Sequence, residues 1–175
     1  LVLGDSITYG LFGTTPQLEP VLRPMLADRG IQLHVTGFPA ESPVYTWPGH
    51  LGWSLRMMHE VETFDPDMIV IQSVLFPGAV YPDQHEAYRR SITELLDIAR
   101  SRDAHVYVVR HHVPPGTEWS PGRDVGEQLQ AEAAAPRGVQ TIPLDWWMAR
   151  CAGGTTADRV HLSAEGQNCH ALAVV

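Results

Sequence analysis

Short strand-like runs of apolar residues alternate along the chain with longer stretches in which apolar residues recur at helical spacing. The strand-like runs cover residues 1–3, 31–36, 68–71, 106–109 and 139–144. Helical spacing occurs over residues 20–30, 51–61, 83–102, 125–133 and 163–175. Strands that alternate with helices form a parallel sheet with helices on both faces, joined by right-handed crossovers. The pattern therefore predicts a three-layer α/β/α fold whose five parallel strands follow the flavodoxin-like order 2-1-3-4-5.

Proline and glycine mark where several of these elements begin and end. Pro20 and Pro24 lie within the first helical stretch, and proline in a helix interior costs roughly 3 kcal/mol. This helix is therefore expected to start near Pro20, to be irregular near Pro24 and to end at Gly30. Residues 114–122 are rich in proline and glycine and predict a loop, and residues 145–147 follow the last strand without a predicted element.

Length and charge exclude several classes of protein. A chain of 175 residues has the usual size of one domain, which we expect to cover residues 1–175. The net charge of -8 repels phosphate backbones, and no cluster of basic residues reverses it locally, so nucleic-acid binding is not expected. No apolar run approaches the ~20 residues needed to span a bilayer. The compartment stays open, because any targeting peptide would precede this numbering, and so does the oligomeric state.

The two cysteines do not indicate a metal site. Cys151 and Cys169 have no C-x-x-C or C-x-x-H partner, whereas structural zinc needs about four ligands, usually in close pairs. A disulfide between them would staple the segment that contains residues 158–161. Two thiols in a chain without a visible secretion signal are more often free, so the sequence favours free cysteines.

A serine at the end of the first strand is the candidate nucleophile. The apolar run at residues 1–3 breaks at Gly4 and leads into Asp5 and Ser6. Ligands of open α/β sheets bind at the carboxyl ends of the strands, and a strand-to-loop corner with glycine beside serine exposes the nucleophile in several hydrolase folds. A serine hydroxyl is a weak nucleophile, so it needs a histidine base that a carboxylate orients.

Asp158 and His161 can supply this base and its carboxylate. They lie three residues apart, so one tight loop can hold the carboxylate against one imidazole nitrogen while the other nitrogen faces outward. Alternatively, Asp158 and His161 are a surface Asp-x-x-His pair without a catalytic role that caps the last helix. That helix is expected to begin with Ser163 as its cap. Asp145 follows the fifth strand, but the spacing of Asp158 to His161 makes Asp158 the better candidate for the acid.

Two segments together resemble the GDSL or SGNH family of serine hydrolases. They are Gly4-Asp5-Ser6-Ile7 and Asp158-Arg159-Val160-His161-Leu162-Ser163. The resemblance implies the same sheet order, with Ser6 as nucleophile, His161 as base and Asp158 as the residue that orients it. It also implies an oxyanion hole made by the backbone N–H of Ser6, a glycine after the second strand and an asparagine after the third strand. No metal or organic cofactor is implied.

Two segments of the sequence, after the second and third strands, depart from the family pattern. Ala40 stands where the donating glycine is expected, and an alanine N–H can still donate where its φ and ψ suit a side chain. After the third strand, residues 74–77 read Val-Leu-Phe-Pro where the family has Gly-x-Asn-Asp, so the asparagine is missing. Losing one oxyanion donor typically costs about 10²–10³ in rate. Candidate replacement donors are Gln72, Ser73, His50 and Arg110.

Other residues near the expected strand ends are candidates for substrate binding. Arg110 could bind a carboxylate or phosphate, or pair with one of the many acidic residues. Phe76 could line and dry an acyl pocket, and aromatic side chains at the mouth could stack on a sugar or cover an acyl chain. The possible substrate-binding residues are Asp5, Gly37, Trp47, His50, Ser73, Phe76, Arg110 and Trp119.

Three functions are compatible with these residues. The first is a serine esterase or deacylase that hydrolyses a small-molecule carboxylic ester through an acyl-enzyme on Ser6. The second is an acyltransferase or biosynthetic tailoring enzyme with the same nucleophile. The third is a non-catalytic binding module on the same fold, which the missing asparagine favours and the complete set of Ser6, Asp158 and His161 opposes.

Overall fold

Five parallel strands form one sheet in the order β2-β1-β3-β4-β5. The computed structural model describes residues 1–5, 8, 17–37, 53–72, 82–110, 120–152, 154–155 and 161–175. The strands are β1 (Val2–Gly4), β2 (Val35–Gly37), β3 (Met68–Gln72), β4 (His105–Arg110) and β5 (Gln140–Pro143). This architecture confirms the predicted α/β/α fold and its strand order.

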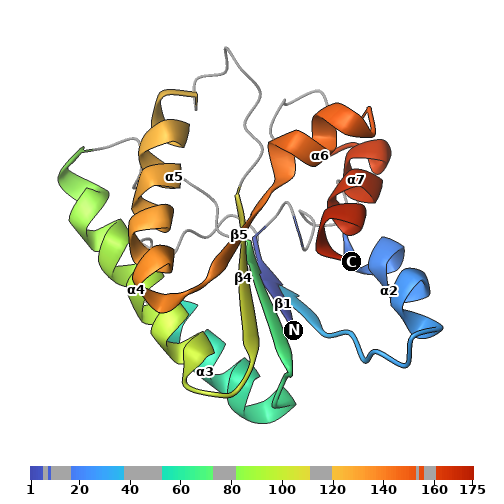
Figure 1. Ribbon diagram of the computed structural model, residues 1–175, viewed down its shortest axis with the longest axis horizontal. Helices are drawn as coiled ribbons and strands as arrows, with labels where there is room; N and C mark the ends of the chain where they lie inside the picture. The colour runs from blue at the N-terminus through green and yellow to red at the C-terminus, as the bar shows by residue number, and fades with distance from the viewer. Residues whose placement is uncertain are drawn as a thin grey trace.

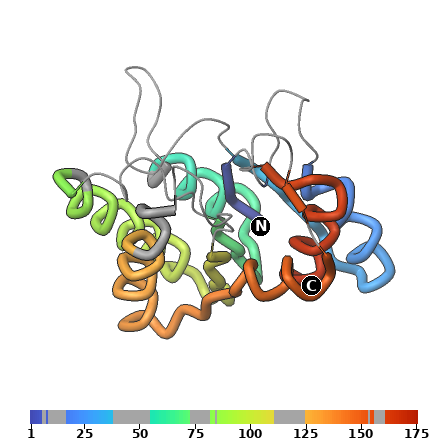
Figure 2. Tube along the Cα trace, turned by 90° about the horizontal axis from the view of Figure 1, so that it is seen from above, coloured from blue at the N-terminus to red at the C-terminus, as the bar shows by residue number. Residues whose placement is uncertain are grey.

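Helices cover both faces of the sheet (Figure 1). On one face lie α3 (Trp53–Phe64), α4 (His85–Arg100) and α5 (Ser120–Ala134), and on the other lie α2 (Glu19–Ala27), α6 (Leu144–Arg150) and α7 (Ala164–Val174). Two short 3-10 turns, η1 (Pro82–Gln84) and η2 (Ala135–Arg137), precede α4 and follow α5. Figures 1 and 2 both show α7 beside α2. Among the described helices, none is long and apolar enough to cross a membrane.

The register brings the carboxyl ends of the strands to one edge of the sheet. Gly4 pairs with Gly37 at the ends of β1 and β2, and Arg110 pairs with Pro143 at the ends of β4 and β5. Gln72 is the last residue of β3 and pairs with Val109. We call this the carboxyl edge. It is the edge at which open α/β sheets bind ligands.

Two buried clusters lie on the two faces of the sheet. Along β3, Ile69 and Ile71 join the cluster under α3, α4 and α5, whereas Val70 joins the other. Strands buried on both faces read as continuous apolar runs, which explains residues 69–71, whereas Met68 at the start of the strand is exposed. We call the second cluster the α7-side core: Val2, Leu18, Leu22, Val35, Val70, Val109, Leu144, Met148, Leu162, Cys169 and Ala171.

The start of the first helix was predicted correctly from the sequence, and the start of the second strand was not. Helix α2 begins at Glu19 and contains Pro24, which confirms the expected start near Pro20. Proline is tolerated in a first turn, because its missing N–H would have no intrahelical partner there. The strand predicted over residues 31–36 is wrong at its start, since β2 covers only Val35–Gly37. Its partner β1 is equally short, so the ladder offers no further pairing.

Helix α5 begins earlier than the sequence predicted, and helix α6 was not predicted. Helix α5 starts at Ser120, inside the predicted loop, because the proline that follows is allowed in the first turn of a helix. Helix α6 follows β5 directly, from Leu144. Leu144 and Met148 are both buried and lie four residues apart, so they share one helical face against the α7-side core. A helix of seven residues is too short for its periodicity to stand out.

Cys151 and Cys169 form a disulfide with a sequence separation of 18, which corrects the expectation of free thiols. The bond joins the end of α6 to the middle of α7. The two Cα atoms lie 5.9 Å apart, within the usual range for a disulfide. Cys151 Sγ also lies 3.1 Å from the carbonyl oxygen of Trp147, a close contact, because a disulfide sulfur carries no proton to donate. The pairing depends on α6, which the sequence did not reveal.

Candidate active site

The structure describes part of the predicted site. Asp5, Gly37, Gln72 and Arg110 lie at the carboxyl edge, and His161 precedes α7. The predictions for the other residues fall outside the described ranges. These residues are Ser6, Ala40, Trp47, His50, Ser73, Phe76, Trp119 and Asp158.

The chain is held on both sides of Ser6. Asp5 and Thr8 are both buried, and the backbone N–H of Thr8 donates to the carbonyl oxygen of Asp5 at 3.1 Å. The carbonyl oxygen of Thr8 in turn accepts from Leu18 N–H at 3.0 Å. Leu18 belongs to the α7-side core, just before α2. The segment that contains the candidate nucleophile therefore begins and ends at fixed points.

Gly4 is needed because Thr8 lies directly against it. A Cβ added to Gly4 would lie 2.5 Å from the Cβ of Thr8, much closer than two carbon atoms can approach without repulsion. The hydroxyl of Thr8 donates a hydrogen bond to Oε1 of Gln72 on β3. Nothing in the sequence pattern marked Thr8 as part of this packing.

A short bridge holds the loop that carries Asp158 and His161. Thr155 and Leu162 form an antiparallel β-bridge, and Ser163 N–H donates to the carbonyl oxygen of Gly154 at 2.9 Å. Leu162 is buried in the α7-side core, directly after the half-buried His161. Both ends of the loop are thus fixed beside the sheet, an arrangement that the sequence did not predict.

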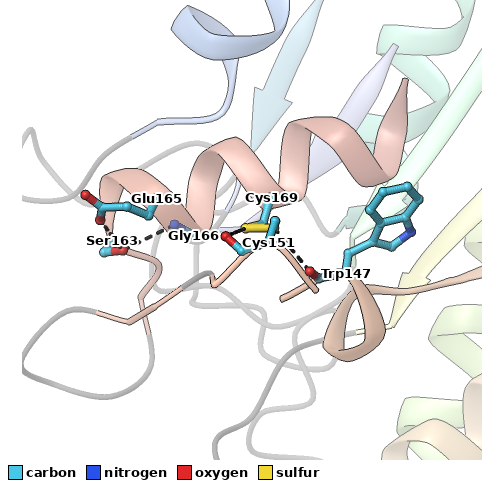
Figure 3. The surroundings of a disulfide bond; sticks show 6 residues. All are labelled: Trp147, Cys151, Ser163, Glu165, Gly166 and Cys169. Carbon is cyan, nitrogen blue, oxygen red and sulfur yellow. Dashed lines mark hydrogen bonds between the residues drawn. A yellow bond between two sulfur atoms is a disulfide. The ribbon is translucent and has the colours of Figure 1, made fainter. Parts of the chain in front are cut away.

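The start of α7 is capped as expected. The Ser163 hydroxyl accepts from Gly166 N–H at 3.2 Å and donates to Glu165 at 2.9 Å. The pKa of Glu165 is lowered, first by a hydrogen bond from its own backbone N–H and then by the Ser163 hydroxyl. Figure 3 shows this cap at the beginning of α7 and the Cys151–Cys169 bond further along the same helix.

Glycine at position 166 lets the first turn of α7 approach the loop. A Cβ at Gly166 would overlap the carbonyl oxygen of Gly154 and lie 3.0 Å from Leu162 Cβ. The start of α7 thus packs closely against the Thr155–Leu162 bridge, which lies next to His161 in the sequence.

Arg110 has an acidic neighbour. Its Nη1 lies 3.4 Å from Oε2 of Glu127 on α5, and both side chains are partly exposed. Glu127 is therefore an acidic partner of Arg110, as expected if Arg110 pairs with an acidic residue. Partly exposed ion pairs contribute little to stability, and a role of Arg110 in substrate binding remains a prediction.

Two grooves lined by described residues lie away from the carboxyl edge. One runs along α3 and α4 and includes Met58, Arg90 and Ile98. The other lies at the opposite end of the strands and includes Leu1 and Met68. Neither contains a residue assigned to chemistry by the sequence. Within the described ranges, no cluster of three or more histidine, cysteine or acidic side chains is placed to hold a metal ion.

The sheet order is compatible with a hydrolase of SGNH type, and the match to a family model shows the class. The chain matches the model of the GDSL-like lipase/acylhydrolase family over residues 2–169 and therefore belongs to that family. No curated protein matches it.

Solved structures share the fold. TesA is 20% identical, with 99% of this chain and 93% of TesA covered and a TM-score of 0.74. A GDSL-like lipase from Bacteroides thetaiotaomicron is 14% identical, with 99% and 83% covered and a TM-score of 0.69. A catalytic mutant of Axe2, an acetylxylan esterase from Geobacillus stearothermophilus, is 18% identical, with 99% and 90% covered and a TM-score of 0.69.

Proposed function

We propose that the protein is a serine esterase or deacylase that hydrolyses a small carboxylic ester through an acyl-enzyme on Ser6. One observation supports this most directly. Leu18, which holds the segment after Ser6, and Leu162, which adjoins His161, are buried in the same α7-side core. Described residues close in sequence to each half of the proposed triad therefore lie in one core cluster.

In the proposed reaction, Ser6 Oγ attacks the ester carbonyl carbon while His161 accepts the hydroxyl proton. Asp158 orients the imidazole and stabilises its charged form. The tetrahedral intermediate collapses, and the alcohol leaves with the proton from His161. Water then attacks the acyl-enzyme and gives a proton to His161. The second tetrahedral intermediate collapses, His161 returns that proton to Ser6 Oγ, and the carboxylic acid leaves. The N–H groups of Ser6 and Ala40 would hold the oxyanion.

The relatives support the choice of residues. The family to which the chain belongs is one of lipases and acylhydrolases. Two catalytic mutants of Axe2 replace an aspartate and a histidine that lie three positions apart. Asp158 and His161 have the same spacing.

The apolar residue Phe76 favours a second candidate function, acyl transfer. Phe76 stands near the position where the polar oxyanion donor is expected. An apolar side chain there would exclude water from the acyl-enzyme and favour attack by an alcohol or amine. The nucleophile and base would be the same in both reactions.

Hydrolysis of nitrophenyl esters with short acyl chains tests the proposal. We expect release of nitrophenol by the wild-type protein and loss of at least about 10³-fold in kcat for Ser6→Ala. Ser101→Ala is the matched control, because Ser101 is exposed just after α4 and its hydroxyl donates to Ile98 O. Equal rates in wild type and Ser6→Ala would refute the proposal. Adding an alcohol or amine distinguishes the functions, since transfer requires an acylated acceptor as product.

A further inference from the structure

We infer that Gln72 is a positioning residue for the nucleophile, acting on the Ser6 segment through Thr8. This inference rests on the proposed function, because it assigns Gln72 a role in the reaction of Ser6. Gln72 lies on β3 and Thr8 follows β1, so the contact joins two neighbouring strands at the carboxyl edge.

Contacts with other described residues fix Thr8. Its backbone bonds to Asp5 and Leu18, its side chain lies against Gly4, and its hydroxyl donates to Gln72 Oε1. The first contact closes the segment that contains Ser6. Among these contacts, the hydroxyl bond to Gln72 is the one that reaches β3, so it adds a side-chain link to the pairing of β1 with β3.

The burial of Gln72 is difficult to explain by stability alone. Thr8 and Gln72 are both 0% exposed, and Gln72 ends an otherwise apolar strand. Its Nε2 is buried without a hydrogen-bond partner among the described residues. A buried amide donor without a partner costs free energy, which an apolar side chain at this position would avoid. A polar side chain kept here at that cost is consistent with a role in the site.

The arrangement has a chemical consequence. A nucleophile must sit within a few tenths of an ångström of its attack position, and a misplacement of about 1 Å can cost about 10²-fold in rate. Without the Gln72–Thr8 bond, β1 stays paired with β3 and Thr8 keeps its backbone bonds, but the chain just after Ser6 loses its side-chain link to β3. Substrate binding elsewhere in the site would change less than the rate of attack. Removing the Gln72–Thr8 bond should therefore lower kcat more than it changes KM.

The test compares variants of the two partners. Thr8→Val keeps the shape and removes the hydroxyl, and Thr8→Ser keeps the hydroxyl. Gln72→Met removes the acceptor, and Gln72→Asn retains an amide on a shorter side chain. Gln130→Met is the matched control, because Gln130 is an equally buried glutamine that donates to Tyr88 at 3.0 Å, in the helix layer on the α4 and α5 side.

We expect Thr8→Val, Gln72→Met and Gln72→Asn to lower kcat by about 10- to 100-fold with KM changed less than about threefold. Thr8→Ser should stay within about threefold of wild type. The double variant Thr8→Val/Gln72→Met should be no slower than the worse single variant, because both remove the same contact. Gln130→Met should lose stability at unchanged kcat.

The rate of Ser6 labelling by a fluorophosphonate separates the two proposals. A wild-type protein that is not labelled at Ser6 would contradict the proposed function. A labelled wild type together with Thr8→Val and Gln72→Asn variants that react at the same rate would overturn the positioning role alone. If Gln72→Met does not fold, the comparison of Thr8→Val with Thr8→Ser decides.

Discussion

At the scale of single residues, His170 is the most unusual titratable group. It is 0% exposed in α7, and neither ring nitrogen has a hydrogen-bond partner within the described ranges. Burial lowers its pKa from 6.5 to about 3, because the charged imidazolium loses its hydration. His170 is therefore neutral in the folded protein throughout the neutral and mildly acidic range.

This burial predicts a loss of stability in acid. Between pH 6.5 and about 3 the unfolded chain binds a proton that the folded chain does not, so His170 lowers the free energy of unfolding by about 1.4 kcal/mol for each pH unit below 6.5. Urea midpoints at pH 7, 6 and 5 measure the effect. The variant His170→Leu should lose stability less steeply than wild type. Parallel pH dependences would show that His170 contributes nothing.

Gly4 gives a second prediction at this scale. A Cβ in Gly4→Ala would push against Thr8 on the buried side of the Ser6 segment. Overpacking of this kind typically costs about 1–3 kcal/mol, and the displaced segment should also lower kcat. Gly154→Ala is the control, because its Cβ would lie 3.3 Å from the nearest atom, Ser163 Oγ. Thermal unfolding and ester hydrolysis of both variants are the measurements, and equal effects would argue against the packing explanation.

At the scale of elements, the disulfide and the cap hold α7 beside α6. Replacing both Cys151 and Cys169 by serine removes a closed loop of about 18 residues. Loop-closure entropy predicts a loss of about 3 kcal/mol in the free energy of unfolding. The same loop contains Asp158 and His161, so the variant should also be less active at temperatures near its lowered midpoint. A wild-type protein whose midpoint is insensitive to reductant would contradict this role.

Local periodicity explains which elements could be predicted. Strand β3 and helix α4 have continuous patterns, and both were found from the sequence. Helix α6 was missed because its buried face consists of Leu144 and Met148 alone. The disulfide was missed for the same reason, since it forms only once α6 lies beside α7. Strand β2 was predicted too long because its length depends on β1, its only neighbour in the sheet.

At the scale of the whole molecule, the sequence predicted the fold and the two ends of the site from local motifs. The contact between Thr8 and Gln72 joins residues 64 positions apart and could not be read from either segment. The bridge between Thr155 and Leu162 likewise depends on how the last loop meets α7. The sequence thus identified the candidate chemical groups, whereas the structure shows what fixes their neighbours.

The central claim is that Ser6 is a nucleophile activated by His161. The most direct test is peptide mapping by mass spectrometry after reaction with a fluorophosphonate, for wild type, Ser6→Ala and His161→Ala. We expect a single adduct on the peptide that contains Ser6 in the wild-type protein, none in Ser6→Ala, and labelling at least about 10²-fold slower in His161→Ala. An adduct on another residue, or labelling that His161→Ala leaves unchanged, would contradict the claim.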